Sequence, residues 1–219
     1  MSFDHEAFWS ARYRDAGDDY LFGTAPNKFL ASQVERFGAG MSVLSVADGE
    51  GRNSVWLAEQ GCAVMATEIS PVALEKAAKL ARGRHVATID ATAGPRVDFV
   101  QADIFDWTWP NEAFDAVVGI FIQFAGPAER PRQLAGMKQA VKPGGLLFLQ
   151  GYTPKQLEYR TGGPSAVENL YTEVLLRETF ADWEIVLLHE HEDLVEEGSA
   201  HAGRSALIDL VARRPATGR

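Results

Sequence analysis

The sequence predicts an α/β protein built on a doubly wound, mostly parallel sheet of seven strands, with helices on both faces and a C-terminal antiparallel hairpin. Two observations predict this fold. Short apolar stretches alternate with helical patterns about five times along the chain, and such alternation produces parallel strands joined by right-handed crossovers. Two strand-like stretches then follow one another near the C-terminus, which indicates a hairpin and one antiparallel strand near the edge of the sheet.

The chain is expected to begin with two helices, at residues 4–15 and 26–37. Asp4 is a suitable N-cap for the first helix, and Pro26 suits the first turn of the second. An aromatic segment at residues 20–23 joins the two helices. The first part of the chain is therefore expected to be helical, ahead of the first strand.

The remaining elements follow from apolar runs and from helix-capping residues. The expected strands are short, apolar and in part β-branched, and they lie at residues 41–47, 62–69, 96–101, 114–121, 146–151, 183–191 and 205–212. The expected helices lie at residues 53–60, 72–82, 129–141 and 172–180. Ser70 and Pro71 form a typical helix start, and Gly61 is suited to end the preceding helix. Residues 83–95 and 152–170 are expected to be loops.

The composition is that of an ordinary globular protein, with 46% hydrophobic and 23% charged residues among 219. The formal net charge of −9 disfavours nucleic acid and anionic membranes as partners, and no stretch is apolar enough for a transmembrane helix. A single cysteine, Cys62, excludes a disulfide framework and fits a reduced, cytoplasmic setting. We expect one domain over residues 1–219, with a helical lid at 1–38, a cofactor-binding core at 39–151 and substrate-side segments at 152–219.

Glycines and acidic residues follow the first strands of the predicted sheet, where ligands of parallel α/β proteins bind. Gly49 and Gly51 follow the first strand and let main-chain N–H groups approach a ligand. Glu68 ends the second strand, where a carboxylate can accept hydrogen bonds from a ribose diol. Asp103 and Ile104 follow the third strand, where they suit an adenine amino group and an adenine ring. Together these residues predict a binding site for an adenosine.

Each of these residues also has a purely structural interpretation. The glycines can serve an ordinary strand-to-helix turn, Glu68 can cap the helix near Ser70, and Asp103 can be a solvated or turn-capping acid. A nicotinamide-dependent oxidoreductase is an alternative function, although Ser54 occupies the position of the third glycine in that motif. A non-catalytic protein that binds a cofactor or a partner is a second alternative.

Four segments resemble class I S-adenosylmethionine-dependent methyltransferases in order and spacing. They are VLSVADGEGRN at 43–53, TEISP at 67–71, QADI at 101–104 and KPGG at 142–145. Two more segments, at 20–27 and 151–164, are similar to small bacterial members related to tellurite-resistance and thiopurine methyltransferases. The resemblance implies a Rossmann-like methyltransferase fold, S-adenosylmethionine as the cofactor and a small molecule as the substrate. Two positions differ from many members of the family, which carry Asp in place of Ser45 and Gly in place of Ala47.

The resemblance further implies which residues bind the cofactor. They lie at the ends of four strands and comprise Ala47, Asp48, Gly49, Gly51, Arg52, Glu68, Ile69, Asp103, Ile104 and Gly119. Arg52 is expected to reach the cofactor carboxylate, or else to be an exposed arginine in the first turn of a helix. The implied reaction is in-line methyl transfer to an acceptor such as a thiol, selenium or tellurium anion. Because such an anion needs little acid–base help, positioning and exclusion of water are the main contributions expected of the enzyme.

The substrate-side candidates are Tyr20, Phe22, Gln123, Tyr152 and His201, and no catalytic residue is predicted among them. Tyr20 and Phe22 can instead pack the N-terminal helices, and His201 can instead be a hairpin-turn residue. The sequence does not indicate an oligomeric state.

His189 and His191 alternate with glutamates along the predicted strand at 183–191, which places both histidines on one face. The pair resembles part of a metal site, but no cysteine or helical partner accompanies it. A solvated edge strand is therefore expected, and no metal is predicted. The acidic cluster between residues 190 and 197 is expected to be a solvated rim.

Overall fold

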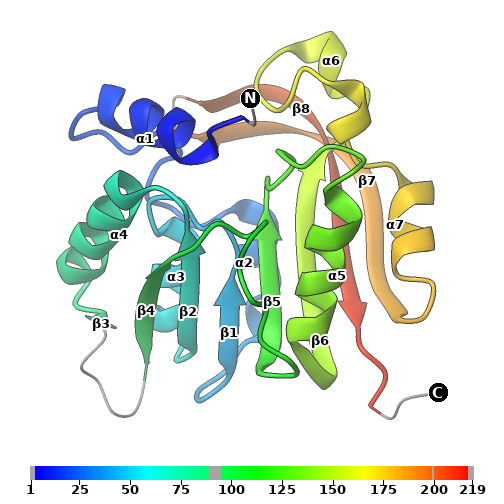
Figure 1. The fold of residues 1–219 in the computed structure, drawn as a ribbon, viewed down its shortest axis with the longest axis horizontal. Helices are drawn as coiled ribbons and strands as arrows, with labels where there is room; N and C mark the ends of the chain where they lie inside the picture. The colour runs from blue at the N-terminus through cyan, green and yellow to red at the C-terminus, as the bar shows by residue number, and fades with distance from the viewer. Residues whose placement is uncertain (1–2, 89–94, 199, 217–219) are drawn as a thin grey trace. The chain divides into compact units, whose positions relative to one another are not determined.

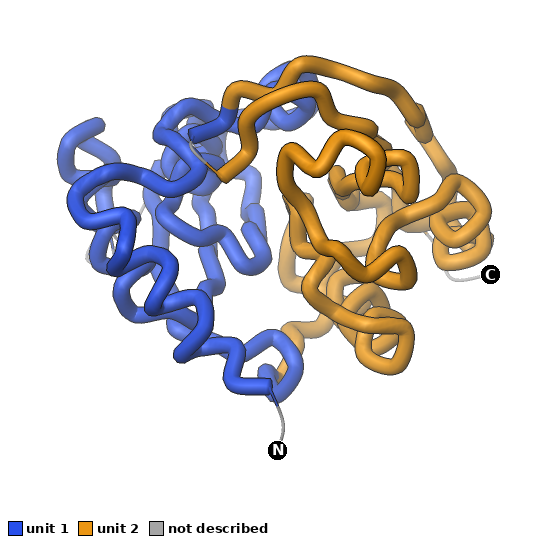
Figure 2. The backbone as a smooth tube through the Cα atoms, turned by 90° about the horizontal axis from the view of Figure 1, so that it is seen from above, with its two compact units in different colours: residues 1–107, 197–199 blue, residues 108–196, 200–219 orange. Residues whose placement is uncertain are grey.

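The computed structural model describes residues 3–88, 95–198 and 200–216, and the chain divides into two compact units. Residues 1–107 with 197–199 form the N-terminal unit, and residues 108–196 with 200–219 form the C-terminal unit (Figure 2). Each unit contains strands paired side by side and helices that pack on them. The predicted functional residues are divided between the two units.

The N-terminal unit begins with α1 (His5–Asp15), whose start follows from its capping residue. The Asp4 carboxylate accepts a hydrogen bond from the Ala7 N–H at 2.9 Å, as the sequence predicts. α1 packs against α4, and the two helices meet where the hydroxyls of Ser10 and Ser70 lie 2.8 Å apart. Helix α1 is therefore fixed onto the unit by a buried polar contact.

The helix predicted at 26–37 is two short pieces. α2 (Lys28–Ser32) begins after Asn27, whose side chain accepts a hydrogen bond from the N–H of Leu30. The 3₁₀ turn η1 (Val34–Arg36) follows it. The helix start is therefore set by the Asn27 side chain, and Pro26 lies before the helix and not in its first turn.

Four strands of the N-terminal unit lie in the order β3-β4-β2-β1 and are all parallel (Figure 1). Their bounds are β1 (Ser42–Ser45), β2 (Ala63–Glu68), β3 (Ala87–Thr88) and β4 (Arg96–Gln101). Because the strands are parallel, the carboxyl ends of β1, β2 and β4 lie at the same edge. The chain therefore leaves three neighbouring strands at one place, which is the place where the sequence predicts a ligand.

Two helices of this unit pack on its strands. α3 (Arg52–Glu59) packs against β2 and β4, and α4 (Pro71–Gly83) contacts the same two strands. The hydroxyl of Ser70 accepts a hydrogen bond from the Ala73 N–H at 3.3 Å, and Pro71 occupies the first turn. The predicted cap and proline therefore set the start of α4 as expected.

The C-terminal unit contains four strands in the order β5-β6-β8-β7. Their bounds are β5 (Phe114–Ile120), β6 (Val141–Tyr152), β7 (Glu184–Glu197) and β8 (His201–Arg213). β5 and β6 are parallel, and β6 and β8 are antiparallel. β7 and β8 are longer than the predicted stretches at 183–191 and 205–212. The extension escaped prediction because its outer part is charged, which is typical of a solvated edge strand and not of a buried one.

The helices of the C-terminal unit are α5 (Arg130–Ala140), α6 (Gln156–Tyr159) and α7 (Glu173–Thr179), with a 3₁₀ turn η2 (Val167–Asn169) before α7. α5 packs on β5 and β6, and α6 packs on β8. The loop predicted at 152–170 therefore contains two short helical turns.

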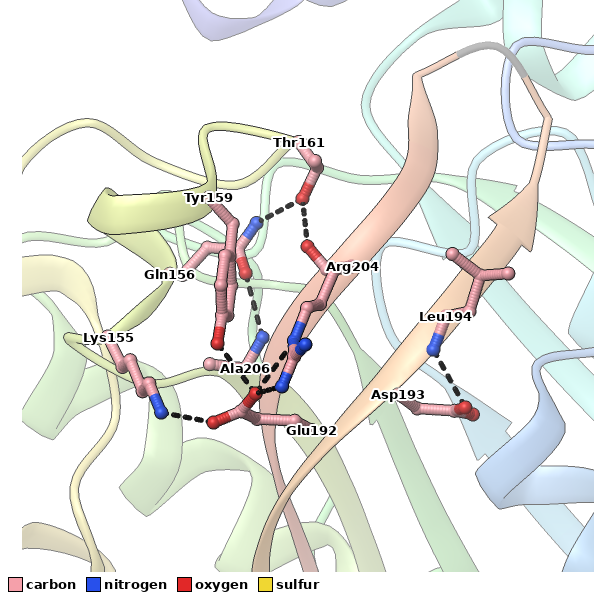
Figure 3. Close-up of polar contacts among 9 residues, drawn as sticks. All are labelled: Lys155, Gln156, Tyr159, Thr161, Glu192, Asp193, Leu194, Arg204 and Ala206. Carbon is pink, nitrogen blue, oxygen red and sulfur yellow. Dashed lines mark hydrogen bonds and ion pairs between the residues drawn. The ribbon is translucent and has the colours of Figure 1, made fainter.

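A polar network fastens α6 to the hairpin strands (Figure 3). Glu192 in β7 pairs with Lys155 at the start of α6, and it accepts hydrogen bonds at 2.6 Å from the Tyr159 hydroxyl and from Arg204 in β8. These pairings hold the pKa of the Glu192 carboxyl at about 2. A side-chain amide adds a buried contact, because Gln156 accepts a hydrogen bond from the N–H of Ala206 at 2.9 Å.

The described residues contain eight strands, whereas the sequence predicted seven. The additional strand is β3, a two-residue strand within the segment predicted as a loop at 83–95; residues 89–94 of that segment lie outside the described residues. A strand this short carries too few residues to show a period in the sequence. Among the helices of the described residues, none has the length and apolarity needed to cross a membrane.

Candidate functional site

The loop after β1 turns through three residues with left-handed backbone conformation. The φ angles are +49° at Ala47, +65° at Gly49 and +89° at Gly51. Glycine adopts this conformation freely, whereas alanine is strained in it. A Cβ atom on Gly51 would lie 2.8 Å from the Cβ of Ala77, and one on Gly49 would lie 2.9 Å from the hydroxyl of Tyr13. Both glycines are therefore required by conformation and by close packing.

Asp48 is held inside this loop by two serines. The Ser45 hydroxyl donates to Oδ1 of Asp48 at 2.6 Å, and the Ser54 hydroxyl donates to Oδ2. The Ser54 N–H also donates to Oδ1, at 3.3 Å. The loop therefore contains a carboxylate although position 45 is a serine. Asp48 supplies one three residues later, and Ser45 orients it.

Glu68 lies at the end of β2 and is only 4% exposed. Its Oε2 atom accepts a hydrogen bond from the Gly49 N–H at 3.0 Å, and Oε1 accepts one from the Ser70 N–H at 2.9 Å. The next residue, Ile69, is held through its carbonyl oxygen, which accepts a hydrogen bond from the Gln101 amide at 3.1 Å. The capping interpretation of Glu68 thus describes one of its oxygens, and the other binds the glycine loop.

Asp103 and Ile104 follow β4 at the same edge of the sheet. The Ala102 N–H donates to the backbone oxygen of Glu68 at 3.0 Å, which places the end of β4 beside the end of β2. Asp103 is half-buried, and its Oδ1 atom accepts a hydrogen bond from the Phe105 N–H at 3.0 Å. Ile104 is buried. The N-terminal unit therefore brings the glycine loop, the carboxylate after β2 and the carboxylate after β4 to three adjacent strand ends.

Arg52 is buried, at 6% exposure, so the interpretation of an exposed first-turn arginine is wrong. Its Nη2 atom donates to Oε2 of Glu197 at 2.6 Å, and Asn27 donates to Oε1 of the same carboxylate at 3.0 Å. Within the described part of the chain, the Nη1 atom of Arg52 is buried and has no hydrogen-bond partner. Glu197 is likewise buried rather than part of a solvated rim, because its charge is paired.

One lysine joins α1 and the segment that follows it to the glycine loop. Lys76 in α4 donates to Oε1 of Glu50 at 2.8 Å and to the backbone oxygens of Tyr13 and Asp19 at 3.0 and 2.7 Å. Glu50 is only 3% exposed, so this ion pair is largely withdrawn from water. The contact fixes the position of α1 and of the loop with respect to each other.

Tyr20 and Phe22 make packing contacts in the N-terminal unit. The Tyr20 hydroxyl donates to the backbone oxygen of Lys76 at 3.1 Å. The Phe22 ring lies 6.4 Å from the ring of Trp9 and 6.2 Å from that of Tyr13, measured between centroids. These contacts agree with the interpretation that Tyr20 and Phe22 pack the N-terminal helices.

Gly119 and Gln123 belong to the C-terminal unit, where close packing surrounds both. A Cβ atom on Gly119, which lies in β5, would approach Ile122 to 2.6 Å and Met137 to 2.8 Å. The Gln123 amide donates to the backbone oxygen of Tyr152 at 2.9 Å and accepts from its N–H at 2.6 Å. Gln123 therefore acts as a backbone partner for the end of β6.

Tyr152 and His201 lie in an aromatic cluster of the C-terminal unit. The Phe121 ring stacks on Tyr152 at 4.7 Å and meets His201 edge-on at 4.5 Å, and the backbone of Phe121 is left-handed with φ of +56°. His201 is 9% exposed and is the first residue of β8. The hairpin-turn interpretation of His201 is therefore wrong, because the hairpin strands extend past the predicted turn.

Burial changes the ionisation of both loop carboxyls. It raises the pKa of Asp48 to about 6, although hydrogen bonds from Ser45 and Ser54 oppose the change. It raises the pKa of Glu68 to about 7, against the opposing effect of hydrogen bonds from Ser70 and Gly49, and the charge of Asp48 adds to the rise. Burial also raises the pKa of the nearby Tyr13 hydroxyl well above its usual value. Burial therefore shifts each of these groups toward its neutral form.

Three residues with notable contacts could not be identified as such from the sequence. Tyr13 lies against the glycine loop, Glu197 pairs with Arg52, and the carboxylate of Asp209 in β8 is hydrogen-bonded to the ring of His191 in β7. Asp209 carried a signal, because it is an acid within an otherwise apolar strand. The other two carried none, since their partners are distant in the sequence.

We expect Ala47→Gly to stabilise the protein. Alanine in a left-handed conformation is strained by about 1 kcal/mol, and glycine relieves the strain at a smaller cost in unfolded-state entropy. The free energy of unfolding, measured by chemical denaturation, should rise by a few tenths of a kcal/mol to about 1 kcal/mol. A decrease would show that the methyl group of Ala47 makes a contact that outweighs the strain.

The raised pKa of Glu68 predicts a fall in stability as the pH rises from about 4.5 to about 7. In this range the unfolded carboxyl ionises while the folded one keeps its proton, so rising pH favours the unfolded state. The free energy of unfolding should therefore fall more between pH 5 and pH 8 in the wild type than in Glu68→Gln. Glu59→Gln, at an exposed position of α3, is the matched control and should follow the wild type. Parallel curves for the wild type and Glu68→Gln would contradict the prediction.

Comparison with known proteins identifies the domain. Residues 43–145 match a family model described as "Methyltransferase domain". The carboxy-S-adenosyl-L-methionine synthase of Yersinia pestis (strain Pestoides F) is 29% identical over 129 residues, which are 59% of this chain and 44% of the relative. The match thus spans less than half the length of these curated relatives.

Solved structures show the same fold. One is described as "Conversion of a Disulfide Bond into a Thioacetal Group during Echinomycin Biosynthesis"; it has a TM-score of 0.77 and 18% identity, with 98% of this chain and 93% of that chain covered. TehB from Haemophilus influenzae has a TM-score of 0.68 and 17% identity, with 95% and 66% covered. The N-methyltransferase NodS from Bradyrhizobium japonicum WM9, in complex with S-adenosyl-L-homocysteine, has a TM-score of 0.68 and 14% identity, with 97% and 100% covered.

The predicted Rossmann-like methyltransferase fold is thereby confirmed, with its mostly parallel strands and its C-terminal antiparallel hairpin. The nicotinamide-dependent alternative is not supported, since the matching domain is a methyltransferase domain. The domain match and the fold thus agree with the resemblance of residues 43–145 to class I S-adenosylmethionine-dependent methyltransferases.

Proposed function

We propose that the protein transfers a methyl group from S-adenosylmethionine to a small molecule whose acceptor atom is already an anion, such as a thiolate, a selenolate or a tellurium anion. The observation that carries the cofactor part of this proposal is the position of Glu68. This buried carboxylate is held by the N–H of Gly49 at the end of β2, beside the ends of β1 and β4.

The proposed cofactor site uses the predicted residues at the strand ends. Two observations fit an adenosine with an attached amino acid. The glycine loop turns at two positions where a side chain would collide with its surroundings, and Arg52 holds a buried guanidinium with one nitrogen that has no partner among the described residues. A buried cationic donor of this kind suits a carboxylate. Within the N-terminal unit, we assign the cofactor to Ala47, Asp48, Gly49, Gly51, Arg52, Glu68, Ile69, Asp103 and Ile104.

The roles follow from the chemistry of each group. Glu68 accepts hydrogen bonds, and the N–H groups of Gly49 and Ser70 orient its two oxygens, so it suits a ribose diol. Asp103 suits the adenine amino group, and Ile104 provides an apolar surface for the ring. S-adenosylmethionine, when bound, supplies an electrophilic methyl group on a sulfonium, whose sulfur keeps the electron pair when the methyl leaves.

The preference for an anionic acceptor rests on the side chains predicted for the substrate. The Gln123 amide is hydrogen-bonded to the backbone of Tyr152, so it is not placed to act as a base. Among these candidates in the described part of the chain, His201 is the one histidine, and its ring packs against the rings of Phe121 and Tyr152. An acceptor that is ionised before it binds needs no proton removed. Positioning and exclusion of water then account for the rate enhancement.

A sulfur acceptor is also compatible with one of the structural neighbours, which is described by the conversion of a disulfide bond into a thioacetal group. That structure shares the fold over 98% of this chain, although its sequence is 18% identical. Thiols are therefore the first compounds to test.

We expect Glu68→Ala to weaken S-adenosylmethionine binding by roughly 1–3 kcal/mol, because the hydrogen bonds that Glu68 accepts from the ribose are lost. Isothermal titration calorimetry measures this directly, and Glu59→Ala provides a matched loss of an exposed glutamate in the same unit. Unchanged affinity in a folded Glu68→Ala variant would remove Glu68 from the cofactor site.

Transfer of a labelled methyl group to a panel of thiols, selenium and tellurium compounds, amines and phenols tests the acceptor class. We expect turnover with the first three groups, and we expect the rate with each thiol to rise as the pH passes the pKa of that thiol. Turnover restricted to amines or phenols would contradict the proposed acceptor while leaving the cofactor site intact. Binding of the cofactor without turnover of any acceptor would favour the non-catalytic alternative.

A further inference from the structure

The outer strands of the C-terminal unit bring together three metal-binding side chains that the methyl-transfer site does not use. His189 and His191 lie on edge strand β7, and Asp209 lies on the neighbouring strand β8. One ligand atom from each of the three residues lies within 4.8 Å of the others. We propose that His189, His191 and Asp209 bind one divalent transition-metal ion, such as Zn²⁺, which fastens β7 to β8.

The atoms of the pair His191 and Asp209 lie slightly closer together than neighbouring metal ligands do. Nε2 of His191 lies 2.9 Å from Oδ2 of Asp209. Two ligands of a tetrahedral ion, each about 2.1 Å from it, are about 3.4 Å apart. An ion can therefore replace the proton between these atoms with little movement of either side chain.

His189 is placed to complete the set. Its ring lies parallel to that of His191, with an interplanar angle of 6° and a centroid distance of 5.0 Å. The two residues share a face of β7 because side chains alternate along a strand. His189 is exposed, so its ring can turn toward the other two ligands without repacking the core, and water can fill the other coordination positions.

Asp209 is held ready by a second residue. Gln150 on β6 is paired with Asp209 in the strand register and donates to its Oδ1 atom at 2.6 Å. This contact leaves Oδ2 directed toward His191. Hydrogen-bonded carboxylates of this kind are typical supports of metal ligands. The site is therefore built across three adjacent strands.

The surroundings of Asp209 also favour a cation. Its neighbours along β8, from 206 to 212, are buried apolar residues, and Asp209 itself is 8% exposed. A carboxylate in such a strand is costly unless it is paired with a positive charge. Two imidazoles and one carboxylate form a ligand set that suits Zn²⁺, Co²⁺ or Ni²⁺ better than the oxygen-preferring Mg²⁺ or Ca²⁺.

A metal here changes the interpretation of the edge strand. Without an ion, His191 and Asp209 form an ordinary hydrogen bond, and His189 is a solvated side chain. With an ion, the last strand of the sheet is cross-linked to its neighbour through side chains. No metal was expected from the sequence because neither a cysteine nor a helical partner accompanies the two histidines, whereas the third ligand comes from the other strand of the hairpin.

Metal titration of the chelator-treated protein tests the proposal. With Zn²⁺ monitored by calorimetry and Co²⁺ monitored by visible absorption, we expect one ion per chain. Asp209→Asn and His191→Ala should each weaken binding at least about tenfold, since losing even a supporting partner of a ligand costs 10- to 100-fold. Zn²⁺ should also raise the melting temperature of the wild type but not of Asp209→Asn.

Two control variants are available. Glu190→Gln changes an acid on the opposite face of β7, and His85→Asn removes an exposed histidine from the N-terminal unit at a left-handed position that asparagine tolerates. Both should bind the ion as the wild type does. If Asp209→Asn does not fold, His189→Ala decides the question, because its exposed side chain contributes little to stability. Absence of bound metal, or binding unchanged in His189→Ala and His191→Ala, would overturn the proposal.

Discussion

A buried carboxylate that accepts two main-chain hydrogen bonds holds together the part of the molecule on which its function depends. Glu68 accepts one hydrogen bond from the N–H of Gly49, in the loop after β1, and another from the N–H of Ser70, at the start of α4. The parallel arrangement brings the strand ends to one edge, but it does not fix the loops that follow them. The hydrogen bonds of Glu68 fix these loops. They require an acid to be buried, and this burial raises the pKa of Glu68.

Two other features show how the glycine loop keeps its shape. The Ser45 hydroxyl orients the Asp48 carboxylate inside the loop, and Ala47 adopts a left-handed conformation between them. The ion pair of Arg52 and Glu197 then connects the start of α3 to the last residue of β7. Breaking one partner of a buried pair costs on the order of 3–5 kcal/mol, so this contact constrains the loop strongly.

The fold and the strand ends could be predicted from the sequence because they follow from local patterns. Apolar runs predicted the strands, and Ser70 followed by Pro71 predicted the start of α4. The charged outer part of β7 could not be predicted, since a solvated edge strand has no apolar period. Long-range pairs were beyond reach for another reason: Glu197 meets Arg52 across 145 positions of the chain. Asp209 was within reach, because an acid in an apolar strand needs a partner.

The most direct test of the account compares S-adenosyl-L-homocysteine with an analogue lacking both ribose hydroxyls, using the wild type and Glu68→Ala in a double-mutant cycle. If Glu68 binds the ribose, removing the hydroxyls should weaken binding to the wild type but have little effect on the variant, which gives a coupling energy of about 1–3 kcal/mol. Equal losses in the two proteins, and hence no coupling, would contradict the assignment of this carboxylate to the cofactor.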